Sequence, residues 1–175
     1  MKPAAATSLD VAVWFLDRAR IEDTYLQPRK LQCLLFLAQA HFVVLHKGRR
    51  LMPSIFLFDE GGPMEPNLYR VFEAGRPTFL ESELDEFVLT FLDAIWRRYA
   101  MMDAMRLDQV IARRGKGEPV IERRDGSEIG PAAMRRMFAT GGGGELAPAP
   151  KVLRSHTGKP LAVKKWMPTR KTPVR

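Results

Sequence analysis

Three histidines and one cysteine are the side chains of this 175-residue chain best suited to hold a transition metal or to act as a nucleophile. His41 and His46 lie five residues apart, so a helix would place them on different faces, and neither has a cysteine or an acid at metal-ligand spacing. His156 lies far along the chain, in a basic segment. Cys33 sits among leucines, which favours a packed, inert thiol. The sequence therefore predicts no metal centre and no catalytic cysteine.

Clustered acids and glycine-rich segments could supply two other kinds of chemistry. The acids of "ESELDE", residues 81–86, could form a catalytic pair, but they precede an apolar helical pattern and favour the first turn of a helix. The segment "DEGGPMEP" lacks a basic residue to meet a phosphate, and "GGGGE" is followed neither by Lys-Ser/Thr nor by a helix, so neither fits a phosphate-binding loop. The first of them also lacks the alternating oxygen ligands of a calcium loop. Because no nucleophile–base arrangement is evident either, we expect no enzyme and no cofactor.

The net charge of +8 is concentrated at one end of the chain. Residues 141–175 contain eight lysines and arginines and one acid, whereas residues 1–140 contain twenty bases and nineteen acids. The basic tail could bind nucleic acid, with Trp166 stacking on a base, and such binding would weaken steeply with salt. Alternatively, it could carry a linear peptide motif, and a lone tryptophan in a polar tail favours this second interpretation over a merely solubilising extension. The motif residues are Leu161, Val163, Lys164, Lys165 and Trp166.

Apolar periodicity and turn residues indicate a mainly α-helical fold. We expect a compact bundle of five to six helices around a buried central helix, 28–47, with a short β element and a small hairpin. A Gly/Ala/Pro linker, 141–150, would separate this helical domain, 1–140, from a basic disordered tail, 151–175. The remaining helices are expected to begin near Thr7, Pro66, Ser82, Asp103 and Pro131, the strand is expected at 55–58, and the hairpin at the "DG" of "VIERRDGSEIG".

The cellular compartment follows from what the chain contains. A single cysteine cannot form an internal disulfide and fits a reducing compartment. The first ten residues lack the apolar run of a signal peptide, and no stretch reaches the roughly 18–20 apolar residues of a membrane span. We therefore expect a cytoplasmic protein that does not contact a membrane.

Two glutamines interrupt the apolar central helix. Gln32 and Gln39 lie two turns apart and so fall on one line along the helix. A buried amide without partners costs about 1–3 kcal/mol, so both side chains are expected to bond irregular backbone, with residues 62–66 as the best candidate. Periodicity alone leaves open the alternative that this line faces water.

These residues also belong to a pattern that resembles the Panacea domain, a family of bacterial and phage antitoxins. The segment "LQPRKLQCLLFLAQAHFV" resembles the family's helix start, and "GGPMEPNLYRVFEAGR" resembles its Gly-Pro-x-x-Pro-x-x-Tyr segment. The likeness extends over roughly residues 9–138. The chain departs from the family after residue 111, where many members carry a Thr-His and a Gly-Pro-Trp segment. The matching motif residues are Pro28, Lys30, Leu31, Gln32, Ala38, Gln39, Gly62, Pro63, Pro66 and Tyr69.

Within this family the chain most resembles the SocA-type antitoxins, which act as proteolytic adaptors. The resemblance implies a cognate protein toxin that attacks the replication sliding clamp. It also implies the ClpX unfoldase of the ClpXP protease as a second partner. The tail would then be the tether to the protease, since adaptors for ClpX commonly dock through a short apolar peptide flanked by lysines. A nucleic-acid-binding regulator that uses the basic tail is the alternative function.

Overall fold

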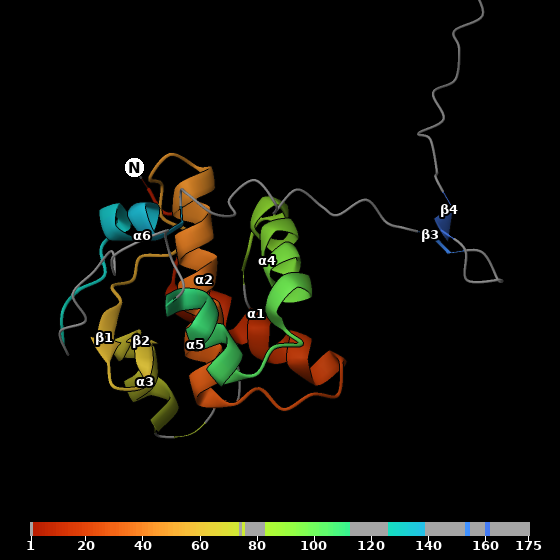
Figure 1. The fold of residues 1–175 in the computed structure, drawn as a ribbon, viewed down its shortest axis with the longest axis horizontal. Coiled ribbons are helices and arrows are strands. Elements are labelled where there is room, and N and C mark those ends of the chain that lie inside the picture. Colours follow the sequence, from red (N-terminus) through yellow and green to blue (C-terminus); the bar gives the residue numbers. More distant parts are fainter. Residues whose placement is uncertain are drawn as a thin grey trace, which may run out of the picture.

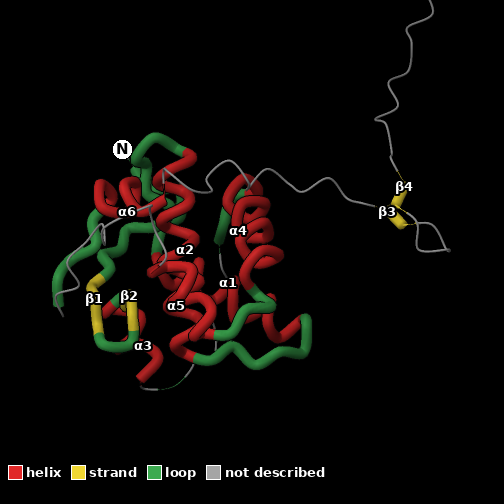
Figure 2. Tube along the Cα trace, in the orientation of Figure 1, coloured by secondary structure: helices red, strands yellow, loops and turns green. Residues whose placement is uncertain are grey.

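The computed structural model describes residues 2–73, 75, 83–112 and 126–138, together with two short strands in the tail. Within these residues the chain is mainly helical, with small antiparallel β elements, as the sequence predicted (Figures 1 and 2). The helices are α1 (Ser8–Ile21), α2 (Pro28–Leu45), α3 (Pro66–Glu73), α4 (Glu86–Tyr99), α5 (Ala104–Ala112) and α6 (Pro131–Phe138), and the strands are β1 (Leu57–Asp59), β2 (Gly62–Met64), β3 (Leu153–Arg154) and β4 (Pro160–Leu161).

Helix α2 is the centre of the fold, as predicted. Every residue from 33 to 43 is buried, so the helix is surrounded on all sides. Helices α1, α4, α5 and α6 and strand β2 all contact it (Figure 1). Aromatic side chains from different elements meet around it; for example, the rings of Phe36 and Phe138 lie 6.1 Å apart at a steep angle. A helix that is apolar all round is stable in water only in such a position.

The ends of the first two helices show which local signals were strong. Thr7 and Asp10 form the predicted capping box of α1, because each side chain accepts a hydrogen bond from the other residue's backbone N–H. Helix α2 ends at Leu45, two residues earlier than predicted. Lys47 already has φ +53, and the Gly48 N–H donates to the Val43 carbonyl at 2.7 Å. Gly48, at φ +100, therefore closes the helix in the left-handed conformation that glycine favours.

Helix α4 begins at Glu86. The prediction that it begins near Ser82 is wrong, because residues 83–85 are not helical. Glu83, Leu84 and Asp85 precede the helix, so of the acids described in 83–86 only Glu86 is in its first turn. Phe87, expected on the buried stripe, is 53% exposed. Asp103 does cap α5, since its carboxylate accepts from the Arg106 N–H at 2.7 Å. Pro66 and Pro131 begin α3 and α6 as predicted.

Strands β1 and β2 form an antiparallel hairpin in which Leu57 faces Met64 and Phe58 faces Pro63. The predicted strand at 55–58 begins two residues later, at Leu57, and ends one residue later, at Asp59. A third backbone segment, 126–129, pairs with the other edge of β1: the Phe58 N–H donates to the Ser127 carbonyl at 2.9 Å. The described side of the predicted "DG" hairpin thus pairs with a strand far away in the sequence. Its upstream side lies outside the described residues, so the hairpin stays a prediction.

The predicted linker, 141–150, lies outside the described residues, as do the tail residues Val163, Lys164, Lys165 and Trp166. In the tail, β3 pairs with β4, so that Leu153 faces Leu161. The disorder of the tail stays a prediction. Among the described helices, none combines the length and apolar character that crossing a membrane requires.

Candidate partner-binding groove

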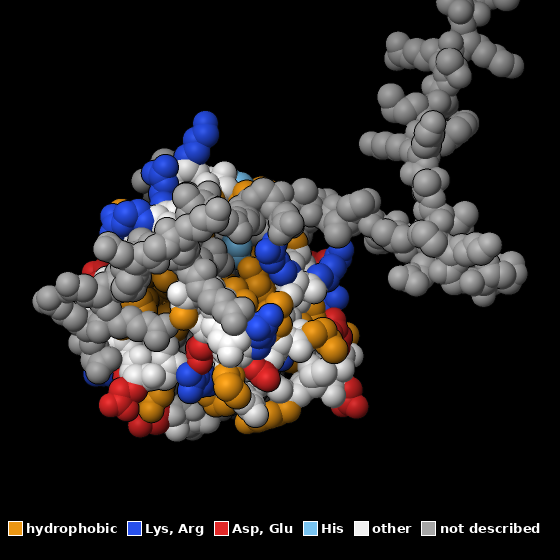
Figure 3. Space-filling view, in the orientation of Figure 1, with side chains coloured by type: hydrophobic (Ala, Val, Ile, Leu, Met, Phe, Trp, Pro, Cys, Tyr) orange, Lys and Arg blue, Asp and Glu red, His pale blue; other side chains and the backbone are white. Residues whose placement is uncertain are grey.

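One open groove of about 960 Å³ lies between the α1–α2 connection, the start of α2, the β1–β2 hairpin and α3. Apolar side chains form most of its wall, and Tyr25 (82% exposed) and Tyr69 (55% exposed) stand at its surface. Apolar side chains also reach the surface along the lower part of the molecule in the space-filling view (Figure 3). The lining residues are Leu16, Ala19, Arg20, Asp23, Thr24, Tyr25, Leu26, Pro28, Arg29, Leu31, Gln32, Asp59, Gly61, Gly62, Pro63, Met64, Tyr69, Phe72 and Glu73.

The two sequence motifs come together at this groove. They are about thirty residues apart in the sequence and belong to separate elements, α2 on one side and β2 with α3 on the other. Lys30, Gln39 and Pro66 are not among the lining residues and have structural contacts instead. The motif residues that line the groove are Pro28, Leu31, Gln32, Gly62, Pro63 and Tyr69.

Gln32 fixes the strand–helix corner of the groove to α2. Its side-chain oxygen accepts a hydrogen bond of 2.8 Å from the backbone N–H of Glu65. This contact confirms the prediction that Gln32 bonds the segment 62–66. Glu65 in turn is fully buried, and its carboxylate accepts from the Leu68 N–H at 2.6 Å and from the Asn67 side chain at 3.2 Å. Glu65 thus caps α3, where the positive end of the helix dipole stabilises a buried carboxylate.

Gln39 fixes a different segment, so the prediction of its partner was wrong. Its side-chain oxygen accepts from the backbone N–H groups of Leu51 (3.0 Å) and Met52 (3.1 Å), and its amide nitrogen donates to the Met52 carbonyl at 3.2 Å. Gln39 is 1% exposed, which excludes the alternative that this side chain faces water. Gln32 and Gln39, which lie on one line along α2, therefore each bond a different irregular segment of backbone.

Lys30 joins the start of α2 to the end of α4. Its ammonium group donates to the carbonyl of Ala100, which follows the last residue of α4, at 2.5 Å. A cation is favoured there because the last carbonyls of a helix carry partial negative charge. Partial burial lowers the pKa of Lys30, and Asp103 acts in the opposite direction. This hydrogen bond between α2 and the end of α4 explains the place of Lys30 in the motif.

Asp108 of α5 lies beside two lining residues, Arg29 and Gly62, and beside Cys33 of α2. Its carboxylate forms an ion pair with Arg29 and lies 3.4 Å from the Cys33 sulfur. A Cβ atom at Gly62 would come within 3.0 Å of the same carboxylate, and Gly62 has φ +108. Any larger residue at position 62 would therefore meet both backbone strain and close contact. The glycine allows β2 to approach α5.

Cys33 is expected to react slowly in the folded protein. Burial, and then the charge of Asp108, raises the pKa of its thiol to about 12, so at pH 8 roughly one molecule in ten thousand is a thiolate. In urea the ordinary pKa of about 9 gives roughly one in ten. Labelling with a thiol reagent at pH 8 should thus be about a thousandfold slower without urea than with it. Equal rates in both conditions would show that the thiol is accessible.

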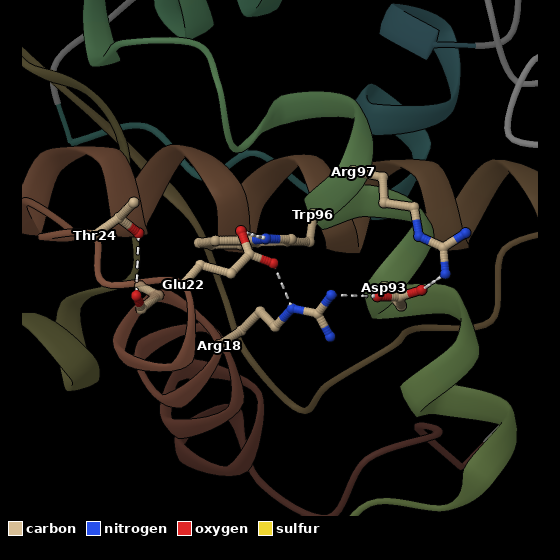
Figure 4. A network of polar contacts seen from close by, with 7 residues as sticks. Arg18, Glu22, Thr24, Asp93, Trp96 and Arg97 are labelled. Carbon is tan, nitrogen blue, oxygen red and sulfur yellow. Dashed lines mark hydrogen bonds and ion pairs between the residues drawn. The ribbon is translucent and has the colours of Figure 1, made fainter. Parts of the chain in front are cut away.

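The wall formed by the α1–α2 connection is held by a polar network (Figure 4). Arg18 of α1 lies between Glu22, at 2.8 Å, and Asp93 of α4, at 3.3 Å. The Trp96 indole N–H donates to Glu22 at 2.9 Å, and Arg97 pairs with Asp93. The hydrogen bonds from Arg18 and then Trp96 lower the pKa of Glu22. This network fixes the chain just before Tyr25 and Leu26 enter the groove.

The remaining chemically capable side chains have structural surroundings. The His41 ring lies 2.7 Å from the Tyr99 hydroxyl inside the core, and the His46 ring packs 4.1 Å from that of Phe42. Burial, followed by the charge of Arg49, lowers the pKa of His46. Within the described parts of the chain, His, Cys, Asp and Glu side chains do not gather in any group of three or more that could hold a metal ion.

Sequence reasoning missed one wall of the groove. Tyr25, Leu26 and Asp23 lie in the connection between α1 and α2, which the sequence showed only as a gap between helices. Asp23 has φ +52 and the Thr24 N–H and hydroxyl both bond the Ala19 carbonyl, which turns the chain back over the groove. An exposed tyrosine in a short connection was the available signal.

Comparison with known proteins finds a similarity to one antitoxin. The chain is 35% identical over 78 residues to Antitoxin SocA from Caulobacter vibrioides (strain NA1000 / CB15N), a match that covers 45% of this chain and 41% of that protein. The matched region is thus less than half of either chain. No protein-family model and no solved structure matches the chain. The similarity to an antitoxin agrees with the resemblance carried by the motif residues.

Proposed function

We propose that the chain is an antitoxin that binds a cognate protein toxin in the groove and delivers it to the ClpXP protease. The observation that carries this proposal is the convergence of both motifs on one open, largely apolar groove. A similarity to Antitoxin SocA over 78 residues supports the antitoxin role. Exposed apolar surface of this kind is a feature of protein-binding sites.

The groove is built to be rigid where a partner would press on it. Gln32 bonds the hairpin side, Lys30 bonds α4, and the Arg18–Glu22–Trp96 network bonds the opposite wall. A preformed surface loses little conformational freedom on binding, which favours affinity. Tyr25 and Tyr69 are suited to act as anchors, because tyrosine is enriched among the residues that dominate binding energy.

In this mechanism the protein performs no covalent chemistry. The helical domain holds the toxin, while the tail contacts the ClpX unfoldase through Leu161–Trp166. The Lys- and Trp-containing peptide is joined to the domain through the glycine-rich segment 141–144, a composition typical of flexible linkers. Holding substrate and protease on one chain raises their effective concentration. Toxicity then ends because the toxin is degraded.

The neighbouring gene provides the direct test. Its product should prevent colony formation when expressed alone and be tolerated when this chain is coexpressed. The double variant Tyr25→Asp/Tyr69→Asp should lose protection and bind the toxin roughly a hundredfold more weakly, as loss of two anchors with charge insertion implies. Survival counts and a pull-down measure the two effects.

A matched control uses exposed apolar residues outside the groove. Met101 is 93% exposed and Met105 69% exposed, so Met101→Asp/Met105→Asp places the same two charges elsewhere on the surface. This variant should protect as the unmodified chain does, and both variants should melt at similar temperatures. A neighbouring product that is harmless and does not bind the chain would contradict the proposal.

A further inference from the structure

The charged side chains of the groove are unbalanced. Both of its arginines are neutralised by acids that are not part of the lining: Arg20 by Asp17, at 3.4 Å, and Arg29 by Asp108. The lining acids Asp23, Asp59 and Glu73 are exposed. They form no ion pair with any other residue that the structure describes.

Acidic side chains also gather at the β1–β2 end of the molecule in the space-filling view, at its lower left (Figure 3). Asp59 is the last residue of β1, and Glu60 follows it in the turn to β2. Among the described residues, the groove therefore combines apolar lining side chains with acids at its border that form no ion pair. Such a surface favours a ligand with apolar side chains flanked by positive charge, and it disfavours phosphate groups.

The backbone at the groove determines which shape of ligand fits. The N–H and C=O groups of Phe58 bond residues 127 and 126 and so point away from β2. Phe58 and Pro63 are therefore a strand pair without hydrogen bonds between them, and the backbone C=O of Pro63 points away from β1. Proline has no N–H, and the next outward N–H, that of Glu65, is occupied by Gln32. An incoming strand would find one acceptor and no free donor along β2. Addition of a strand to this edge is thereby excluded as the main binding mode.

We propose that the groove binds an amphipathic helix of the toxin whose apolar face is bordered by lysine or arginine. This inference rests on the proposed function and adds the chemistry of the bound segment. A helix satisfies its own backbone groups and needs no donors from β2. Its apolar side chains would pack beside Tyr25 and Tyr69, and its cations would lie near Asp59 and Glu73.

Charge reversal in the full-length chain tests this proposal. Asp59→Lys/Glu73→Lys should weaken binding of the purified neighbouring product by roughly tenfold or more, because like charges would then face each other. Glu83 and Glu128 are exposed and outside the lining. The matched control Glu83→Lys/Glu128→Lys should change the dissociation constant by less than about threefold.

A second probe makes the test independent of the toxin's identity. It is a synthetic helical peptide with leucines at i, i+3, i+4 and i+7 flanked by lysines, followed by fluorescence anisotropy. The unmodified chain should bind it roughly tenfold more tightly than the same peptide with glutamates for lysines, and Asp59→Lys/Glu73→Lys should abolish that preference.

The outcomes separate the two proposals. If the neighbouring product is neither toxic nor bound but the lysine peptide binds the groove, the proposed function fails and the chemistry of the groove stands. If the toxin depends on Tyr25 and Tyr69 but ignores Asp59→Lys/Glu73→Lys, the function stands and the basic-helix inference is wrong. Tighter binding of a peptide of residues 158–168 than of the toxin would assign the groove to the chain's own tail, and would also overturn the inference.

Discussion

Replacing Gln39 by leucine should lower the free energy of unfolding by about 3–5 kcal/mol, because two buried backbone N–H groups would lose their partner and the Met52 carbonyl would keep only the Ser54 N–H. The Gln39 amide bonds the N–H groups of Leu51 and Met52 and the carbonyl of Met52, and both residues are fully buried. Water cannot replace these contacts without opening the core. A loss of this size is a large part of the 5–15 kcal/mol that is typical of a folded domain.

The same substitution at Gln32 is the matched control. It removes one hydrogen bond, to the Glu65 N–H, from a partly buried position on the same helix line. Gln32→Leu should therefore lower the free energy of unfolding by only about 1–2 kcal/mol. Urea unfolding curves with equal slopes would compare the variants. Equal losses for both would mean that the 51–52 segment finds other hydrogen-bond partners.

Truncation after Gly144 should leave toxin binding within about twofold and lengthen the toxin's half-life in cells by roughly tenfold or more, because the proposed tether to the protease is lost. The groove residues all precede the α3 end at Glu73, so the deletion removes no lining residue. A pull-down measures toxin binding, and a chase after translation arrest measures the toxin's half-life.

Point variants in the full-length chain separate the peptide from the mere presence of a basic tail. Lys164→Glu/Lys165→Glu should slow toxin degradation nearly as much as the truncation, and Trp166→Ala should slow it as well. Arg170→Glu/Lys171→Glu makes the same change of charge a few residues later and should leave degradation almost unchanged. Degradation at the normal rate by the truncated chain would contradict the tether.

Features that depend on neighbouring residues could be predicted from the sequence. The Thr7–Asp10 capping box, the proline starts of α3 and α6 and the buried centre of α2 are each encoded within a few turns of helix. The predicted start of α4 was wrong because a run of acids is typical of a first helical turn but does not show at which residue the helix begins. Asp85 occupies the N-cap position without a side-chain cap bond, so local hydrogen bonding did not mark that start.

Features that depend on distant contacts could not be predicted in the same way. The pairing of β1 with residues 126–129 joins segments about seventy residues apart, which no local pattern indicates. For Gln39, periodicity left open whether the amide is buried, and it did not show which loop would reach it. The contact of Gln32 with residues 62–66 was predicted, whereas the wall with Tyr25 depends on how α1 packs against α4 through Glu22 and Trp96.

Pro63 also affects how the free protein behaves when it accumulates. Exposed strand edges with vacant donors and acceptors recruit strands from other copies, which is a common route to fibrils and edge-to-edge dimers. The outer edge of β2 presents a proline, and its next donor is held by Gln32, so this edge cannot template such growth. The free chain can therefore accumulate without associating through this strand.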